Sequence, residues 1–192
     1  MVSVQDHKRA LDGDQGPNTG GMGTVSPCHQ PQPRRPQADH AGDRAARPIG
    51  GLAAEGRRYQ GVLYAGLMIT DAGPKVLEFN ARFGDPETQV IMARMRSDIV
   101  PILQRRGRGP ARATRRSSGP RSRRSAWCWR AKGYPDDARR PARRSSGLDA
   151  LEEESDVVVY HAATAQKDGE VVTVRRARAR GDRASAPNLD AA

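Results

Sequence analysis

Residues 62–82 constrain the fold most, because they join two different strand patterns through one turn. Residues 62–69 form a continuous apolar run, which predicts a strand buried on both faces. Asp71, Gly73 and Pro74 mark a turn, and residues 75–82 then alternate apolar and polar side chains with a period of two. We therefore expect an antiparallel hairpin in this part of the chain.

Helix signals follow the hairpin directly. Asp85 predicts an N-cap, Pro86 the first helical position and Glu87 an acid in the first turn. Residues 97–98 predict a fresh cap for a short second helix that ends at Leu103. The first helix has an apolar side made by Val90, Ile91, Met92 and Met95.

A small β-rich unit is predicted toward the end of the chain. Residues 148–154 are helix-like, and residues 157–162 and 170–174 have strand patterns on either side of a turn at 167–169. Together with the hairpin and its helices, this predicts an α+β fold.

Four segments, 28–48, 105–124, 138–144 and 175–187, have neither helix nor strand periodicity. Residues 105–124 hold nine arginines and no acidic side chain. We expect all four to be irregular, because they lack the apolar side chains whose burial offsets ordering entropy.

The net charge of +11 favours a nucleic-acid or acidic-membrane partner in general, but its distribution matters. Residues 51–100 carry six acidic and six basic side chains, so the excess lies in the arginine-rich segments. Non-specific nucleic-acid binding by these segments is expected from counterion release. Trp127 and Trp129 could stack bases, although a strand position accounts for them equally well.

Cysteine usage and hydropathy exclude several other classes. Cys28 and Cys128 have no short Cys–Cys spacing, which disfavours a zinc site or a disulfide framework and predicts a reduced, cytoplasmic setting. The four histidines share no ligand spacing. No apolar run approaches the length of a membrane span, so we expect no membrane insertion.

The alternating strand places Glu78, Asn80 and Arg82 on one face, with neighbouring members of the set about 6.6 Å apart along the strand. A carboxylate beside an amide oxygen suits Mg²⁺, which takes few protein ligands and completes its shell with phosphates and water. An arginine one step further can clamp a phosphate. An ordinary amphipathic strand with a solvated polar face has the same spacing, and on spacing alone it is the favoured interpretation.

A glycine-rich loop runs from residue 16 to residue 23 and includes Gly20, Gly21, Met22 and Gly23. Glycines allow backbone N–H groups to approach an anion closely. The loop matches neither a Walker loop nor a dinucleotide fingerprint, and taken alone a surface turn is the favoured interpretation. Residues 6–9, just upstream, form a mixed-charge run that is typical of a solvated segment.

Taken together, residues 5–9, 12–14, 16–23, 64–67 and 78–89 resemble the phosphoribosylamine–glycine ligase family. The string Arg82-Phe83-Gly84-Asp85-Pro86-Glu87 is similar to that family's own signature. Residues 131–135 and 156–162 resemble its C-terminal domain, in the same order. The recognisable parts cover a little over half of the chain.

The resemblance implies a partial ATP-grasp domain in which Glu78 and Asn80 bind Mg²⁺ (or Mn²⁺) on ATP. It implies that Arg82 is catalytic and that Asp85 and the loop Gly20, Gly21, Met22 and Gly23 bind phosphate or substrate. In this family ATP phosphorylates the carboxylate of glycine, and the amine of phosphoribosylamine then attacks the glycyl phosphate to form an amide.

The resemblance also implies a domain order: part of an ATP-grasp domain at 1–104 (irregular over 28–48), an arginine-rich linker at 105–126, and a remnant of the ligase C-terminal domain at 127–192. Nothing in these residues resembles the family's N-terminal substrate domain or its adenine-contacting part, so we expect the 192 residues to be inactive alone. The alternative is an arginine-rich nucleic-acid-binding protein without enzymatic activity.

Overall fold

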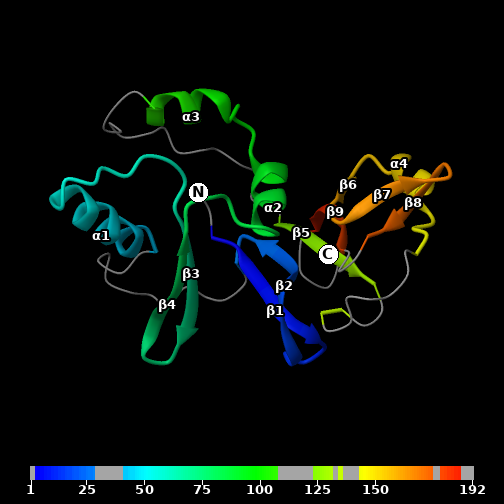
Figure 1. Cartoon of the computed structure of the whole chain (residues 1–192), viewed down its shortest axis with the longest axis horizontal. Coiled ribbons are helices and arrows are strands. Elements are labelled where there is room, and N and C mark those ends of the chain that lie inside the picture. The colour runs from blue at the N-terminus through cyan, green and yellow to red at the C-terminus, as the bar shows by residue number, and fades with distance from the viewer. Residues whose placement is uncertain are drawn as a thin grey trace. The chain divides into compact units, whose positions relative to one another are not determined.

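A computed structural model of the chain describes residues 3–28, 41–107, 123–131, 134–135, 143–174 and 178–186, with the backbone alone in 41–46, 105–107 and 178–186. These residues fall into two compact units (Figure 1). The first unit combines Met1–His29, Asp85–Arg96 and Ser118–Ala192, and the second combines Gln30–Gly84 and Ser97–Ser117. Because the units interleave along the chain, the contiguous domain order expected above stays a prediction.

The first unit is built on a five-stranded sheet in which every neighbouring pair is antiparallel. Residues far apart in sequence are direct neighbours here, since Gly23 lies opposite Trp127 and Ser26 opposite Arg124. The strands lie in the order β1 (Gln5–Leu11), β2 (Gln15–Ser26), β5 (Arg123–Arg130), β9 (Arg178–Ala186) and β6 (Val157–His161).

Helix α2 (Glu87–Arg94) packs on β2 and β5 of this sheet (Figure 1). Its Val90 is fully buried, and the Thr24 hydroxyl of β2 donates a hydrogen bond to the Pro86 carbonyl at 3.2 Å. Apart from two buried prolines, Pro74 and Pro86, the buried apolar side chains among the described residues are Val25, Val90, Ala126 and Cys128. This core is small and is lined by buried hydroxyls, which require hydrogen-bond partners.

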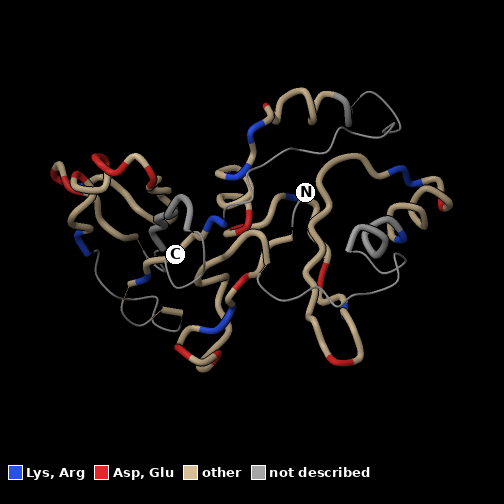
Figure 2. The backbone as a smooth tube through the Cα atoms, turned by 180° about the vertical axis from the view of Figure 1, so that it is seen from behind, with Lys and Arg blue, Asp and Glu red and all other residues tan. Residues whose placement is uncertain are grey.

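The predicted strands at 157–162 and 170–174 are confirmed at 157–161 and 170–173, whereas a strand at 164–167 was not predicted and β6 pairs with β9 in the five-stranded sheet. Helix α4 (Leu148–Glu152) contacts β6, and β7 (Thr164–Lys167) pairs with β8 (Glu170–Thr173) around a turn at 168–169. Gly169 has φ +78°, a left-handed conformation that glycine adopts without strain. Acidic residues follow one another closely along α4 and the residues after it (Figure 2), namely Asp149, Glu152, Glu153 and Glu154.

The second unit contains helix α1 (Ala41–Ala54), the antiparallel pair β3 (Tyr64–Thr70) and β4 (Gly73–Asn80), and helix α3 (Val100–Gly107). The predicted hairpin is therefore confirmed, with boundaries shifted by one or two residues. The predicted second helix is also present, and the backbone N–H of Val100 donates to Asp98 Oδ1 at 2.9 Å, as a helix cap does. Among the described residues, no helix is both long and apolar enough to cross a membrane.

The expectation that residues 62–69 are buried on both faces is wrong. In β3 only Gly66 is buried, while Met68 and Ile69 are 51 % and 54 % exposed. The sheet that holds this strand has two strands, so its apolar side chains lack the covering layers that a parallel sheet supplies.

The expectation of irregular structure is corrected at several places. Residues 41–48 belong to α1, residues 105–107 end α3, and residues 123–124 begin β5. Residues 29–40, 108–122, 138–142 and 175–177 lie outside the described residues. Most of the segment 175–187 is strand β9, which pairs with β5 and β6. Backbone N–H and C=O groups form such a ladder whatever the side chains are, so a strand between two others needs no apolar periodicity.

Candidate functional site

Glu78 and Asn80 lie at the C-terminal end of strand β4. Glu78 lies opposite Gly66 and Asn80 opposite Tyr64, with regular pairing between them, so both side chains point to the same face. The common face predicted for this pair is therefore confirmed. A β-carbon at Gly66 would lie 3.2 Å from Glu78 Cγ, so the glycine leaves room for the carboxylate side chain.

A β-bulge precedes Glu78. Gly66 pairs with Glu78 whereas Leu67 pairs with Val76, so Leu77 is an extra residue in β4. Leu77 is 62 % exposed. Bulges of this kind bend a strand and redirect the side chains that follow. The bulge therefore sets the direction in which Glu78 and Asn80 point.

The donor set on β4 suits a divalent cation. Glu78 is exposed, and the buried Asn80 Nδ2 has no hydrogen-bond partner among the described residues. An unpaired buried amide costs about 1–3 kcal/mol, so this position favours a partner from outside. Rotation of the amide exchanges nitrogen for oxygen at the same place, and an oxygen there can bind a cation beside a carboxylate. The described residues bring together no group of three His, Cys, Asp or Glu side chains, so the remaining ligands of a cation would be phosphate or water.

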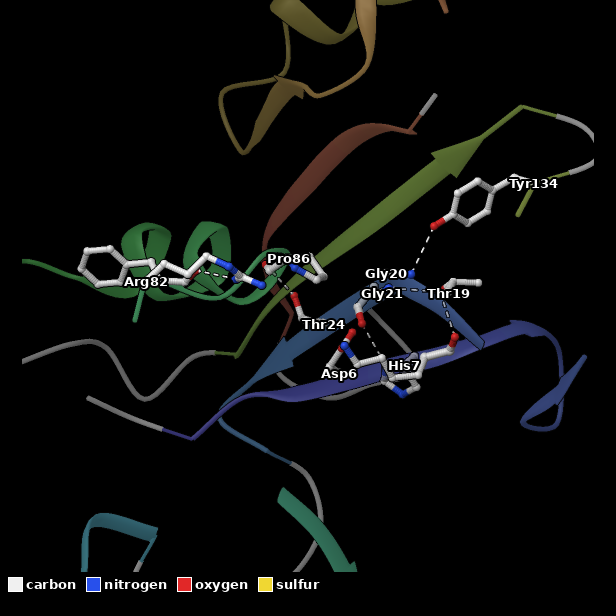
Figure 3. Close-up of polar contacts among 12 residues, drawn as sticks. Asp6, His7, Thr19, Gly20, Gly21, Thr24, Arg82, Pro86 and Tyr134 are labelled. Carbon is white, nitrogen blue, oxygen red and sulfur yellow. Dashed lines mark hydrogen bonds and ion pairs between the residues drawn. The ribbon is translucent and has the colours of Figure 1, made fainter. Parts of the chain in front are cut away.

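The prediction that Arg82 continues the face of Glu78 and Asn80 along the strand is wrong. β4 ends at Asn80, and Arg82 lies in the bend that follows. Its guanidinium is exposed and donates from Nη1 to the carbonyl of Phe83 at 2.9 Å (Figure 3). The period of two ends with the strand pairing, so Arg82 is positioned by the bend.

The glycine-rich loop is a bulge inside strand β2. On β1, His7 pairs with Gly23 and Arg9 with Asn18, so the four residues 19–22 lie opposite the single residue Lys8. This bulge, residues 19–22, is called the glycine bulge below. It contains Gly20, Gly21 and Met22, whereas Gly23 has already returned to the ladder.

Gly21 is the residue that the bulge requires to be glycine. Its φ is +106°, a conformation that L side chains rarely adopt. A β-carbon would also lie 2.5 Å from Pro86 Cδ and 2.9 Å from Asp6 Oδ1. The bulge is thus pressed against the segment that leads into α2 (Figure 3).

The two central amides of the glycine bulge already have partners. The N–H of Gly20 donates to the Tyr134 hydroxyl at 3.2 Å, and the N–H of Gly21 donates to Thr19 Oγ1 at 3.0 Å (Figure 3). The Thr19 hydroxyl in turn donates to the carbonyl of Lys8 at 2.8 Å. The hydrogen bonds of Thr19 therefore stabilise the bulge from within, while Tyr134 comes from a distant segment.

An ion pair lies beside the glycine bulge. Lys8 Nζ is 3.0 Å from Asp6 Oδ2, in a geometry outside that of a hydrogen bond, and the Asp6 side chain is only 10 % exposed. Asp6 Oδ1 has no hydrogen-bond partner among the described residues. Sequence reasoning treated this run as solvated and missed both residues. Their signal was the spacing of two within a strand, which places Asp6 and Lys8 on one face.

Asp85 is exposed and accepts a hydrogen bond from Gln89 Nε2 at 2.9 Å. The predicted helix start is wrong by one residue, because Pro86 is the N-cap and no side chain caps the helix. Pro86 has ψ +12° and its carbonyl accepts from Thr24, so packing on β2 fixes where α2 begins.

Arg94 holds the other end of α2 on the sheet. Its Nη1 donates to Ser26 Oγ at 3.2 Å, and the residue is 8 % exposed. Burial, and to a smaller extent the neighbouring Arg124 guanidinium, lowers the pKa of Arg94 from its ordinary value. This arginine is far too basic to lose its charge near neutral pH, so it acts in packing.

Comparison with known proteins agrees with this arrangement. Residues 1–88 match the family described as "Phosphoribosylglycinamide synthetase, ATP-grasp (A) domain". The chain is 48 % identical to the phosphoribosylamine–glycine ligase of Caulobacter vibrioides over 169 residues, which cover 86 % of this chain and 38 % of that protein. It is 44 % identical to the ligase of the same name from Halalkalibacterium halodurans over 184 residues, 90 % of this chain and 39 % of that protein.

A solved structure is similar over nearly all of the chain. The crystal structure of phosphoribosylamine–glycine ligase from Thermotoga maritima superposes with a TM-score of 0.70 and 30 % identity, over 98 % of this chain and 45 % of that one. The chain therefore spans about two fifths of the length of the relatives it matches. These similarities support the ligase interpretation and not the arginine-rich nucleic-acid-binding alternative.

Proposed function

The chain belongs to the phosphoribosylamine–glycine ligase family, and we propose on this premise that it provides the metal- and phosphate-binding part of such a ligase. The reaction joins glycine to phosphoribosylamine with ATP as co-substrate, through a glycyl phosphate. We further propose a cytoplasmic setting, which is where free ATP and reduced cysteines coexist.

One observation carries the proposal: Glu78 and Asn80 share a face of β4, and the buried Asn80 Nδ2 lacks a hydrogen-bond partner among the described residues. A carboxylate and an amide oxygen are the few protein ligands that Mg²⁺ or Mn²⁺ takes when phosphates complete its shell. A bound divalent cation neutralises phosphate charge and polarises the phosphoryl oxygens. Glu78 and Asn80 would hold that cation, and the bulge at Leu77 would keep both side chains aimed at it.

The proposed roles of the other residues follow from their charges and from their hydrogen-bond donors and acceptors. The exposed guanidinium of Arg82 can stabilise charge on a phosphoryl or acyl phosphate group. The glycine bulge offers backbone N–H groups to an anion, with the Lys8 ammonium nearby. Asp85 carries an exposed carboxylate that can accept a hydrogen bond from an amine or hydroxyl of a substrate.

The experiment is a titration of ATP by calorimetry, with Mg²⁺, with Mn²⁺ and without metal. We expect ATP to bind only with a divalent cation, and Glu78→Gln and Asn80→Ala each to weaken metal-dependent binding more than tenfold. The matched control is Glu55→Gln, which removes one exposed carboxylate from the same unit and should leave the affinity unchanged. Equal metal dependence in all variants would exclude β4 as the metal site.

A further inference from the structure

The contact between Tyr134 and Gly20 joins residues that are 114 positions apart. Gly20 is exposed, and its N–H points to the phenolic oxygen at 3.2 Å (Figure 3). A phenolic oxygen can accept a hydrogen bond, and here it occupies the place that an oxygen of an anionic ligand would take on this N–H. Tyr134 therefore uses the donor that the glycine bulge would offer to a phosphate.

The partners of the two bulge amides differ in how they can be exchanged. Thr19, the partner of Gly21, is two residues away and its hydroxyl also donates to Lys8, so its removal would disrupt the bulge itself. Tyr134 belongs to another segment, and its departure would leave the hydrogen bonds of Thr19 intact. Of these two amides, that of Gly20 is therefore the one that can be transferred to a ligand without loss of the hydrogen bonds of Thr19.

Arg130 holds Tyr134 in place from the end of β5. Its Nη1 donates to the Tyr134 carbonyl and its Nη2 to the Ala10 carbonyl of β1, each at 3.4 Å. One guanidinium therefore ties the backbone of Tyr134 to the strand beside the glycine bulge. Because the backbone of Tyr134 is already held close to the bulge, the residue loses less entropy when its hydroxyl contacts Gly20, which makes the phenol an effective competitor.

We propose that the Tyr134 hydroxyl is an internal competitor for the Gly20 amide, which an anionic ligand displaces when it binds at the glycine bulge. This rests on the proposed phosphate-binding role of the bulge. The chemical class of the ligand is a phosphate or polyphosphate oxygen. Ligand binding at the bulge is consequently coupled to the positions of Arg130 and Tyr134.

The size of the coupling follows from the bond that is exchanged. The ligand must replace an existing hydrogen bond. Its apparent affinity is therefore lowered in proportion to the fraction of molecules in which the Gly20 N–H is free of Tyr134. A single neutral hydrogen bond shifts such an equilibrium by about two- to tenfold. Removal of the hydroxyl should therefore strengthen binding by about that factor.

The test is a calorimetric titration of pyrophosphate into the full chain and into Tyr134→Phe, which keeps the ring and removes the acceptor. We expect about two- to tenfold tighter binding to Tyr134→Phe, and the same direction for Arg130→Ala, which releases Tyr134 by a different route. The matched control is Tyr59→Phe, which also loses a hydroxyl-to-backbone hydrogen bond, to Val62, but lies in the other unit. Its affinity for pyrophosphate should not change.

Amide exchange gives a second readout on the same proteins. Without ligand, the Gly20 amide should exchange faster in Tyr134→Phe than in the parent chain, and pyrophosphate should slow it in both. Unchanged or weaker binding to Tyr134→Phe, with binding to the parent intact, would overturn the competition alone and leave the bulge a phosphate site. Failure of the parent chain and every variant to bind pyrophosphate would overturn both the competition and the phosphate-binding role of the bulge.

Discussion

Gly23 of β2 and Ala126 of β5 approach so closely that a β-carbon at position 23 would lie 2.7 Å from the Ala126 carbonyl oxygen. β-Carbons in proteins essentially never lie so close to another heavy atom, and a backbone oxygen cannot move aside as the end of a flexible side chain can. The glycine that ends the predicted anion loop is therefore a packing residue, which brings residues 23–26 against a strand about a hundred positions further on.

Gly23→Ala should lower the free energy of unfolding by roughly 1–3 kcal/mol, because the strands must separate to admit the methyl group. Chemical denaturation followed by circular dichroism measures this. The matched control is Gly50→Ala in helix α1, where the added methyl group meets nothing within 4 Å. The control should be neutral or stabilising by up to about 1 kcal/mol; a Gly23→Ala chain as stable as its parent would contradict the close approach.

Asn80→Leu should stabilise the metal-free chain by about 1–2 kcal/mol, because it replaces an unpaired buried amide with an apolar group of similar size. The same change should abolish metal-dependent ATP binding. Thermal unfolding with and without Mg²⁺-ATP measures both effects. Asn18→Leu, at an exposed position of β2, should change stability by less than about 0.5 kcal/mol. A loss of stability in the metal-free Asn80→Leu chain would argue that this amide has a structural partner.

Arg94→Gln should change the free energy of unfolding by the same amount at every pH from 6 to 9. The pKa of Arg94 is lowered in the folded chain, so the unfolded chain holds that proton more tightly. A lowered pKa in the folded chain means that the protonated guanidinium disfavours the folded state. This destabilisation is fully present at pH values below the folded pKa, and it is relieved only as the pH rises from the folded pKa toward the unfolded pKa. Guanidine denaturation at four pH values measures the difference, with the exposed Arg96→Gln as control. A difference that varies across this range would mean that Arg94 is coupled to a group titrating near neutrality.

The 192 residues by themselves should form no detectable amide product from glycine and phosphoribosylamine. They span about two fifths of the relatives' length, and positioning of both co-substrates supplies about 7–11 kcal/mol of a typical rate enhancement. An ADP-release assay with freshly prepared phosphoribosylamine measures turnover. Glycine-dependent turnover that disappears in Glu78→Ala would show that this part of the ligase suffices for catalysis.

Local patterns in the sequence determined the order of elements around the candidate metal site. The alternation at 75–82, the turn before it and the acid at Asp98 predicted a hairpin followed by two helices, and the structure has β3, β4, α2 and α3 in that order. These features depend on neighbours within a few residues, which is why sequence alone could predict them. The shared face of Glu78 and Asn80 follows from the same period of two.

Only the tertiary structure decided the form of the glycine segment and the end of the chain. The bulge at 19–22 exists because His7 and Arg9 of β1 set the register on either side of it, and β9 exists because β5 and β6 flank it. The partner of Gly20 is equally remote, since Tyr134 reaches it from another segment. Such pairings join backbone groups that carry no sequence signature, so their register is set by which strands meet and not by the residues within them.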